Sequence, residues 1–170
     1  MSPPIATARA CSNIAFITYW GKRDASVNWP LNDSLSMCLS EASTTTTVEW
    51  MPEGGDDEIW FNGERLTDHR ATRISRHLDR MREHWYPWGA RVATRNTFPA
   101  GTGIASSASG FAALTAAAIH AFGEWIPNDQ EFSRWARRGS GSACRSIHAG
   151  FVEWQAGGWT GRAGRGLTVP

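Results

Sequence analysis

Apolar and polar residues alternate along much of the first 65 positions, a pattern that predicts a mostly antiparallel sheet. Small and apolar side chains alternate from Ile5 to Ile17 and predict two short strands joined near residues 11–13. Leu35–Leu39 and the β-branched run in Thr44–Trp50 predict two further strands. Glu58–Phe61 predicts a strand that runs into a tight turn at an Asn-Gly pair.

The period then changes to that of a helix. Apolar residues recur near helical spacing from Leu66 to Trp85, with arginines on the other faces. Ala90–Thr94 predicts a strand, and residues 105–122 predict an alanine-rich apolar helix. A short helix is expected over residues 128–137, with Asn128 or Asp129 as its N-cap.

The end of the chain differs from the rest. Phe151–Trp154 predicts a last strand. Residues 156–170 read AGGWTGRAGRGLTVP and carry no periodic pattern, so we expect an unstructured tail after a single domain of residues 1–155.

One stretch, FPAGTGIASSASGF at 98–111, joins small flexible residues and two hydroxyl groups to the start of the alanine-rich helix. Backbone N–H groups and the positive end of the helix dipole meet there, which favours phosphate binding. The stretch lacks the lysine of the GxxxxGK[ST] phosphate-binding loop. Two interpretations stay open from these residues: a phosphate-binding loop with Ser106 and Ser107, or a turn at Gly101 and Gly103 before a serine cap.

Two other segments combine charged and hydroxyl groups. Residues 19–24 read YWGKRD, and a tyrosine hydroxyl beside lysine and arginine suits phosphate or carboxylate; a solvated turn is the alternative. Residues 137–146 read RRGSGSACRS and place three serines around Arg145 at a second predicted helix N-terminus. The loop at 98–111 and the segment at 137–146 are thus two predicted anion-binding segments, and together they suggest an enzyme that handles two phosphorylated ligands.

The composition narrows the classes of protein and partner. With 41% hydrophobic and 19% charged residues, the 170-residue chain has the make-up of one globular domain. A formal net charge of +1 gives no argument for nucleic-acid or membrane binding, and no apolar run is long enough to span a bilayer. Three cysteines without a CxxC pair fit a reducing compartment, so we expect a cytoplasmic protein in which Cys11 and Cys38 are small buried side chains.

These motifs carry a family resemblance. YWGKRD at 19–24, NTFPAGTGIASSASGFAAL at 96–114, RRGSGSACRS at 137–146 and GFVEW at 150–154 closely resemble the mevalonate diphosphate decarboxylases of the GHMP kinase superfamily. The resemblance runs from about Thr7 to Gln155 and implies an α+β fold. That fold is the N-terminal lobe of a GHMP kinase, a mostly antiparallel sheet with helices packed on one side and the helix at 105–122 in a central place.

The resemblance also implies the chemistry. Enzymes of this family use ATP and Mg²⁺ to phosphorylate the tertiary hydroxyl of mevalonate 5-diphosphate, and loss of phosphate and carbon dioxide then gives isopentenyl diphosphate. The 5-monophosphate stays an open alternative as substrate. The expected partner is this small molecule, without nucleic acid or membrane, and pairing into a homodimer is left open.

Individual roles follow from the same resemblance. ATP would be bound by Pro99, Gly101, Gly103, Ala105, Ser106 and Ser107, with Ser107 also a magnesium ligand. The diphosphate and carboxylate of the substrate would be bound by Tyr19, Trp20, Gly21, Lys22, Arg73, Ser140, Gly141, Ser142, Ala143, Cys144 and Arg145. Arg145 and Ser107 are the expected catalytic residues, and Arg70 and Arg76 are alternatives to Arg73.

Two departures from the family pattern leave the activity open. The family has a lysine immediately before the tyrosine of YWGKRD, paired with the catalytic aspartate, where this chain has Thr18. The family's second lobe, with its catalytic aspartate, has no counterpart in these residues, and neither Asp24 nor Asp33 matches that aspartate. We therefore expect a truncated or frame-shifted product, or a fragment. The alternatives to a decarboxylase are a mevalonate or phosphomevalonate 3-kinase that does not decarboxylate, and an inactive remnant that still binds nucleotide.

Overall fold

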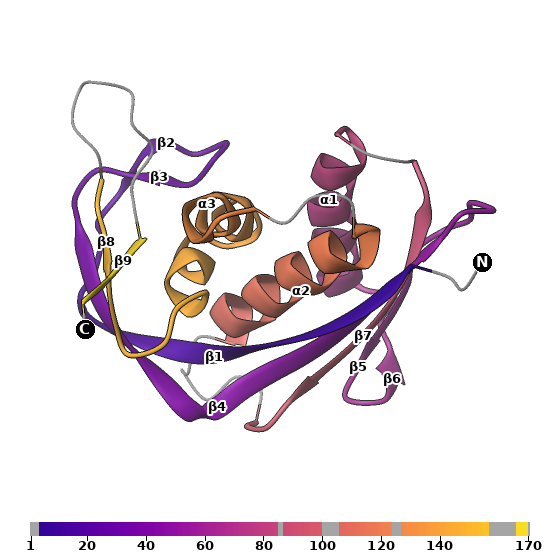
Figure 1. Cartoon of the computed structure of the whole chain (residues 1–170), viewed down its shortest axis with the longest axis horizontal. Helices are drawn as coiled ribbons and strands as arrows, with labels where there is room; N and C mark the ends of the chain where they lie inside the picture. The colour runs from indigo at the N-terminus through magenta and orange to yellow at the C-terminus, as the bar shows by residue number, and fades with distance from the viewer. Residues whose placement is uncertain (1–3, 85–86, 100–105, 124–126, 157–165, 170) are drawn as a thin grey trace.

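The chain folds into a curved sheet that carries its helices on one face (Figure 1). The computed structural model describes residues 4–84, 87–99, 106–123, 127–156 and 166–169. The strands of the main sheet are β1 Ile5–Ile17, β4 Ser34–Met51, β5 Glu58–Phe61, β6 Glu64–Arg65, β7 Gly89–Asn96, β8 Phe151–Trp154 and β9 Gly166–Val169. A separate two-stranded sheet pairs β2 Lys22–Asp24 with β3 Trp29–Pro30, and the helices are α1 His69–Arg82, α2 Ser106–Phe122, α3 Asp129–Gly139 and the 3₁₀ helix η1 Gly141–Ser146.

The sheet is built around β4. Its order is β6-β5-β7-β4-β8-β9, and β1 pairs with the remaining side of β4. The strand pairs are antiparallel except β5 with β7, which is parallel. These findings confirm the predicted α+β architecture with a mostly antiparallel sheet and helices on one side.

The helix α2 lies at the centre of the helical layer, as predicted. Its alanines are buried at 108, 112, 113, 117, 118 and 121, and side chains this small let the helix lie close to β1 and β4. The strand β4 supplies Val48 and Trp50 to the core beneath it, both fully buried. The indole Nε1 of Trp50 donates to the carbonyl oxygen of Ala118 at 3.0 Å, which ties the second half of α2 to the sheet.

The prediction of two short strands in 5–17, and of two more in 35–50, was wrong. Each region is one continuous strand, and the pairing of β1 with β4 shifts between Cys11 and Ser12, which pair with Ser43 and Leu39. The extra residues 40–42 of β4 form a β-bulge there, which Arg9 braces by donating to the Oγ of Ser43 at 2.8 Å. A bulge interrupts the alternation of side chains much as a turn does, so the pattern was mistaken for two strands.

The other helices begin at side-chain caps. Asn128 caps α3 through a capping box in which its Oδ1 accepts from the backbone N–H of Glu131 and the Glu131 carboxylate accepts from Asn128 N, both at 3.1 Å. Asn128, rather than Asp129, is therefore the cap. Asp68 caps α1, which is shorter than the predicted 66–85 because the N–H of Leu66 bonds to the carbonyl of Ile59 in the sheet.

The predicted unstructured tail was wrong for residues 166–169. Their backbone forms β9, which pairs with β8 over Phe151–Trp154, and Ala156 before it donates its N–H to Asp33 at 2.6 Å. Residues 157–165 lie outside the described part of the chain. Across the described helices, none combines the length and the apolar character that crossing a bilayer requires.

Candidate functional site

Three residues of the predicted ATP site are described: Pro99, Ser106 and Ser107. Ser106 and Ser107 open α2 and are half-buried, and the first N–H groups of a helix have no partner within it. Pro99 is exposed at the end of the segment that precedes the loop. Three predicted ATP-binding residues, Gly101, Gly103 and Ala105, lie outside the described residues.

The two predicted anion-binding segments meet at Ser140. This residue ends α3 and caps η1, and its Oγ donates to the Oγ of Ser107 at 3.4 Å. The Oγ of Ser142 lies at the same distance, 3.4 Å, from that of Ser140. Three hydroxyl groups from two distant parts of the sequence therefore gather where α2 begins.

Tyr19 joins this group from the end of β1. Its ring packs edge-on against Trp154 with centroids 4.8 Å apart. Gly141 lies so close that a Cβ at this position would stand 2.5 Å from the Tyr19 hydroxyl, so only glycine fits there. Burial raises the pKa of Tyr19, opposed by the nearby Arg145, and the hydroxyl remains a hydrogen-bond donor at neutral pH.

Arg145 is buried beside Tyr19, with 4% of its surface exposed. Its Nη1 donates to the Oγ of Ser34 at 2.9 Å, and its Cζ lies 5.9 Å from the centroid of the Tyr19 ring. Among the described residues it forms no salt bridge with a carboxylate. Burial lowers its pKa, yet an arginine stays protonated at neutral pH, so this cation has no carboxylate counter-charge in the part of the chain that the structure describes.

Asn13 in β1 is a site residue that sequence reasoning missed. It is 3% exposed, and its Oδ1 accepts from the Nε and the Nη2 of Arg145, both at 3.4 Å. Its Nδ2 donates to the Oγ of Ser146 at 2.8 Å and to the carbonyl of Ser142 at 3.2 Å. Asn13 therefore orients both Arg145 and the start of η1. The only signal in the sequence is an amide within a strand of small and apolar residues.

Ala143 and Cys144 are predicted substrate contacts whose side chains are buried in η1. The N–H of Ala143 donates to the carbonyl of Ser140 at 2.9 Å, and the Sγ of Cys144 donates to the carbonyl of Gly141 at 3.1 Å. Burial raises the pKa of Cys144 to about 12, so its thiol is uncharged. The two side chains thus shape the turn. The two other cysteines are half-buried rather than buried as expected.

The residues Trp20, Gly21 and Lys22 lead into the β2–β3 hairpin. Trp20 is 78% exposed and Lys22 is exposed, and no contact recorded for the described residues joins their side chains to Arg145 or Ser140. Gly21 has a φ of +77°, a conformation that favours glycine. The part of these three residues in substrate binding stays a prediction.

A pocket of about 180 Å³ lies beside the start of α2, between α1 and the sheet. Its apolar wall is Phe61, Ile74, Val92, Phe111 and Leu114, its neutral polar groups are Thr44, Thr46, Thr94, Asn96, Ser106 and Ser107, and its cations are Arg70 and Arg73. A space lined by apolar side chains, two arginines and the two serines that open α2 suits an organic phosphate.

The pocket distinguishes among Arg70, Arg73 and Arg76, which the sequence left as alternatives for binding the substrate. Arg76 does not line the pocket, and Arg70 lines it but is paired with Asp68 at 2.9 Å. Arg73 lines it with no salt bridge recorded within the described chain, and its Cζ stands 5.1 Å from the centroid of the Phe111 ring. The geometry favours Arg73 for an incoming anion.

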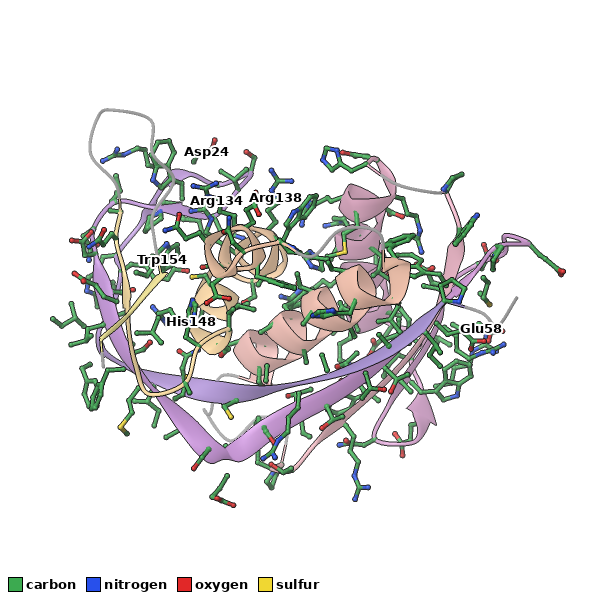
Figure 2. The ribbon with its side chains drawn as sticks, in the orientation of Figure 1. Asp24, Glu58, Arg134, Arg138, His148 and Trp154 are labelled. Carbon is green, nitrogen blue, oxygen red and sulfur yellow. The ribbon has the colours of Figure 1, made fainter. Side chains whose placement is uncertain are left out.

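The end of α3 adds positive charge to this region. Arg137 is 6% exposed, and burial lowers its pKa. The positive charges of Arg134 and Arg138 lower this pKa further, whereas Cys144 and Asp24 raise it. Arg134 and Arg138 project from α3 near the hairpin that carries Asp24 (Figure 2). The cluster makes the surroundings of Ser140 favourable for anions.

The described residues include no group of three or more histidine, cysteine, aspartate or glutamate side chains that could hold a metal ion. The hydroxyl of Ser107 fits one position on a magnesium ion, whose other ligands would be phosphate oxygens and water. The carboxylate of Asp24 accepts from the N–H and the hydroxyl of Ser26, which lowers its pKa, and that of Asp33 accepts from Ala156. Both acids are thus engaged in local structure, away from the pocket.

The chain is similar to proteins of one enzyme family. Residues 10–163 match a family model described as the diphosphomevalonate decarboxylase-like N-terminal domain. A diphosphomevalonate decarboxylase from Eremothecium gossypii is 40% identical over 176 residues, which cover 92% of this chain and 43% of that protein. This chain therefore spans less than half the length of that curated relative.

Solved structures give the same result. The crystal structure of mevalonate diphosphate decarboxylase from Staphylococcus aureus is 38% identical, with a TM-score of 0.90 over 98% of this chain and 50% of that chain. A structure described as MDDEF in complex with MVAPP, AMPPCP and magnesium has a TM-score of 0.89 at 38% identity, with the same coverage. With the family model matched from Ala10 to Ala163, this chain belongs to the diphosphomevalonate decarboxylase-like N-terminal domain family.

Proposed function

We propose that this chain supplies the phosphate- and carboxylate-binding lobe of an ATP-dependent diphosphomevalonate decarboxylase. The observation that carries the proposal is the meeting of Ser107 with Ser140 beside the buried Arg145. Hydroxyl groups at a helix start suit phosphate, and a planar guanidinium that pairs with no carboxylate of the described residues suits the carboxylate of a ligand. The name of the family and the ligands of the solved relative support the same assignment.

Different residues would bind the two ligands, ATP and mevalonate 5-diphosphate. ATP would supply the phosphoryl group that turns the tertiary hydroxyl of mevalonate 5-diphosphate into a leaving group, with magnesium partly neutralising the phosphates. Ser106 and Ser107 would bind the ATP phosphates together with the N–H groups of α2, and Ser107 would be a magnesium ligand. Tyr19 and Ser140 would donate to the diphosphate of the substrate.

Arg145 would hold the carboxylate that leaves as carbon dioxide. Its partners Asn13 and Ser34 are neutral, so they orient the guanidinium without neutralising it. A fixed carboxylate keeps the breaking carbon–carbon bond aligned with the carbon–oxygen bond of the leaving group, which lowers the entropic part of the barrier. Arg145 is therefore proposed as a catalytic residue.

A specific observation favours a second function. Thr18 stands where the family has a lysine; it is exposed, and its carbonyl accepts from the Nδ2 of Asn32 at 3.3 Å. A hydroxyl cannot supply the charge that keeps a neighbouring carboxylate ionised. This favours a mevalonate or phosphomevalonate 3-kinase that does not decarboxylate, with a nucleotide-binding remnant as the third candidate. The buried Arg145 keeps the decarboxylase first.

The deciding experiment measures carbon dioxide release from carboxyl-labelled mevalonate 5-diphosphate beside ADP release. It uses the 170-residue chain and the same chain joined to the second lobe of a related decarboxylase. In the joined protein, equal release of both products supports the decarboxylase, ADP alone indicates the 3-kinase, and neither product with retained ATP binding indicates the remnant. Light scattering on the same sample tests the homodimer, and a cytoplasmic location likewise stays a prediction.

A further inference from the structure

The guanidinium of Arg73 lies over the ring of Phe111. The Cζ of Arg73 stands 5.1 Å from the centroid of the ring, within the range of a cation–π interaction. Phe111 is 7% exposed, whereas Arg73 is exposed, and both line the pocket beside Ser107. An exposed side chain on α1 thus packs on a buried one on α2.

The ring itself is fixed from two sides. The imidazole of His77 packs edge-on against it, with centroids 5.3 Å apart and planes at 89°. A Cβ on Gly139 would stand 2.8 Å from the Cγ of Phe111, so the last residue of α3 touches the ring. Close packing on two sides restricts the movement of the ring.

The contact with His77 is that of a neutral imidazole. The hydroxyl of Thr115 donates to the carbonyl of Phe111 at 2.6 Å, so it accepts from the Nε2 of His77, which lies 2.9 Å away. His77 is fully buried and leaves Nδ1 without a hydrogen-bond partner among the described residues. The ring of Phe111 therefore meets one cation, Arg73, rather than two.

The same ring stands next to both anion-binding segments. Phe111 follows Ser107 by one helical turn on α2, and Gly139 directly precedes Ser140. The position of the ring thus sets where Arg73 lies relative to the two serines.

We propose that Phe111 is a positioning residue for phosphate binding: its ring holds the Arg73 guanidinium at the pocket so that the cation meets a phosphate of the bound substrate. The proposal rests on the proposed function for the identity of that substrate. A long exposed side chain loses rotamer freedom when it binds a ligand, and a guanidinium already held over a ring has lost part of it beforehand.

The test measures binding by calorimetry in two backgrounds, the natural chain and Arg73→Met. Position 111 is changed to leucine, and separately to pentafluorophenylalanine, which keeps the size of the ring and reverses its quadrupole. The probes are mevalonate 5-diphosphate and inorganic pyrophosphate. In the natural background both changes should weaken binding about 2- to 5-fold. In the Arg73→Met background neither change should weaken it further, because the interaction partner is gone.

A matched control separates positioning from general packing. Phe122 lies at the other end of α2 and stacks on Trp50 with centroids 4.5 Å apart. Phe122→Leu removes the same group from the same helix and should lower the unfolding temperature without changing the affinity for either probe. If Phe111→Leu does not fold, the fluorinated chain still gives the answer.

Each outcome decides the proposal. Equal weakening at position 111 in both backgrounds, no weakening in either, or no binding of either probe by the natural chain would overturn it. If pyrophosphate binding depends on Phe111 through Arg73 but mevalonate 5-diphosphate binds no better than pyrophosphate, the positioning role stands and the proposed function fails.

Discussion

The Oγ atoms of Ser107 and Ser140 lie 3.4 Å apart, although the two residues belong to different helices. Ser107 is in the first turn of α2, and Ser140 ends α3. The two helices pack against each other and against η1. The hydroxyl groups of the site are therefore placed by helix packing in the core.

Arg145→Lys should weaken the binding of mevalonate 5-diphosphate and leave ATP binding nearly unchanged. A planar fork meets a carboxylate with two hydrogen bonds, and a lysine cannot reproduce them. We expect a loss of roughly 2–5 kcal/mol in the binding free energy of the substrate, measured by calorimetry. The control is Arg95→Lys, at an exposed arginine of β7. Equal losses for both ligands would show that Arg145 is structural.

Gly139→Ala should destabilise the fold, whereas Gly110→Ala should not. A Cβ at 139 would stand 2.8 Å from the Cγ of Phe111 and 2.9 Å from the Nδ1 of His77, while at 110 it meets nothing within 4 Å. Overpacking costs about 1–3 kcal/mol, and alanine in place of an open helical glycine gains up to about 1 kcal/mol. Urea unfolding measures both changes. Similar midpoints for the two variants would contradict the close contact at 139.

His77 should make the protein less stable as the pH falls. Burial, with smaller effects from Arg80 and Arg138, lowers its pKa from 6.5 to about 3. Below pH 6.5 the unfolded chain binds a proton that the folded chain refuses down to about pH 3, so acid favours unfolding across that window. The free energy of unfolding should fall by up to about 1.4 kcal/mol per pH unit through this residue. The measurement compares the natural chain with His77→Gln between pH 7 and pH 4; parallel curves would argue against a neutral buried imidazole.

Thr18→Lys should raise carbon dioxide release in the chain joined to a second lobe. An ammonium group beside the aspartate of that lobe keeps it ionised and oriented. The 170-residue chain without the second lobe should bind nucleotide weakly and release no carbon dioxide, because phosphoryl transfer needs charge on both sides of the transferred group. Release of carbon dioxide in step with ADP by this chain alone would refute that, and a local acid such as Asp24 would then be the residue to mutate.

Local patterns predicted the helices and the family motifs well. Asn128 stands at a strong capping sequence, and the alanine-rich run of α2 has few alternatives to a helix. The serines of the site and Arg145 lie in contiguous motifs, so the sequence predicted them before their contacts were known. Their roles in binding stay predictions.

The features that sequence missed depend on pairing between distant residues. The bulge opposite Cys11 exists only in the register of β1 with β4, and Asn13 becomes a site residue only because the strand carries it to Arg145. The strand β9 has a glycine-rich, patternless sequence and forms by pairing with β8. No window along the chain contains such information.

The buried alanines of α2 leave little free space around the helix, so it moves as one body. Its 17 residues extend about 25 Å, with Trp50 bonded to Ala118 towards one end and Ser107 at the other. Ala117 is fully buried, so a larger side chain there would have to displace its neighbours, and the displacement can shift the helix about its bonded end. Enlarging a buried alanine far from Ser107 can therefore change the distance between Ser107 and Ser140, whereas shortening the half-buried Phe122 adds no volume and leaves the helix in place. The spacing of the two hydroxyl groups can thus change without a substitution at either serine.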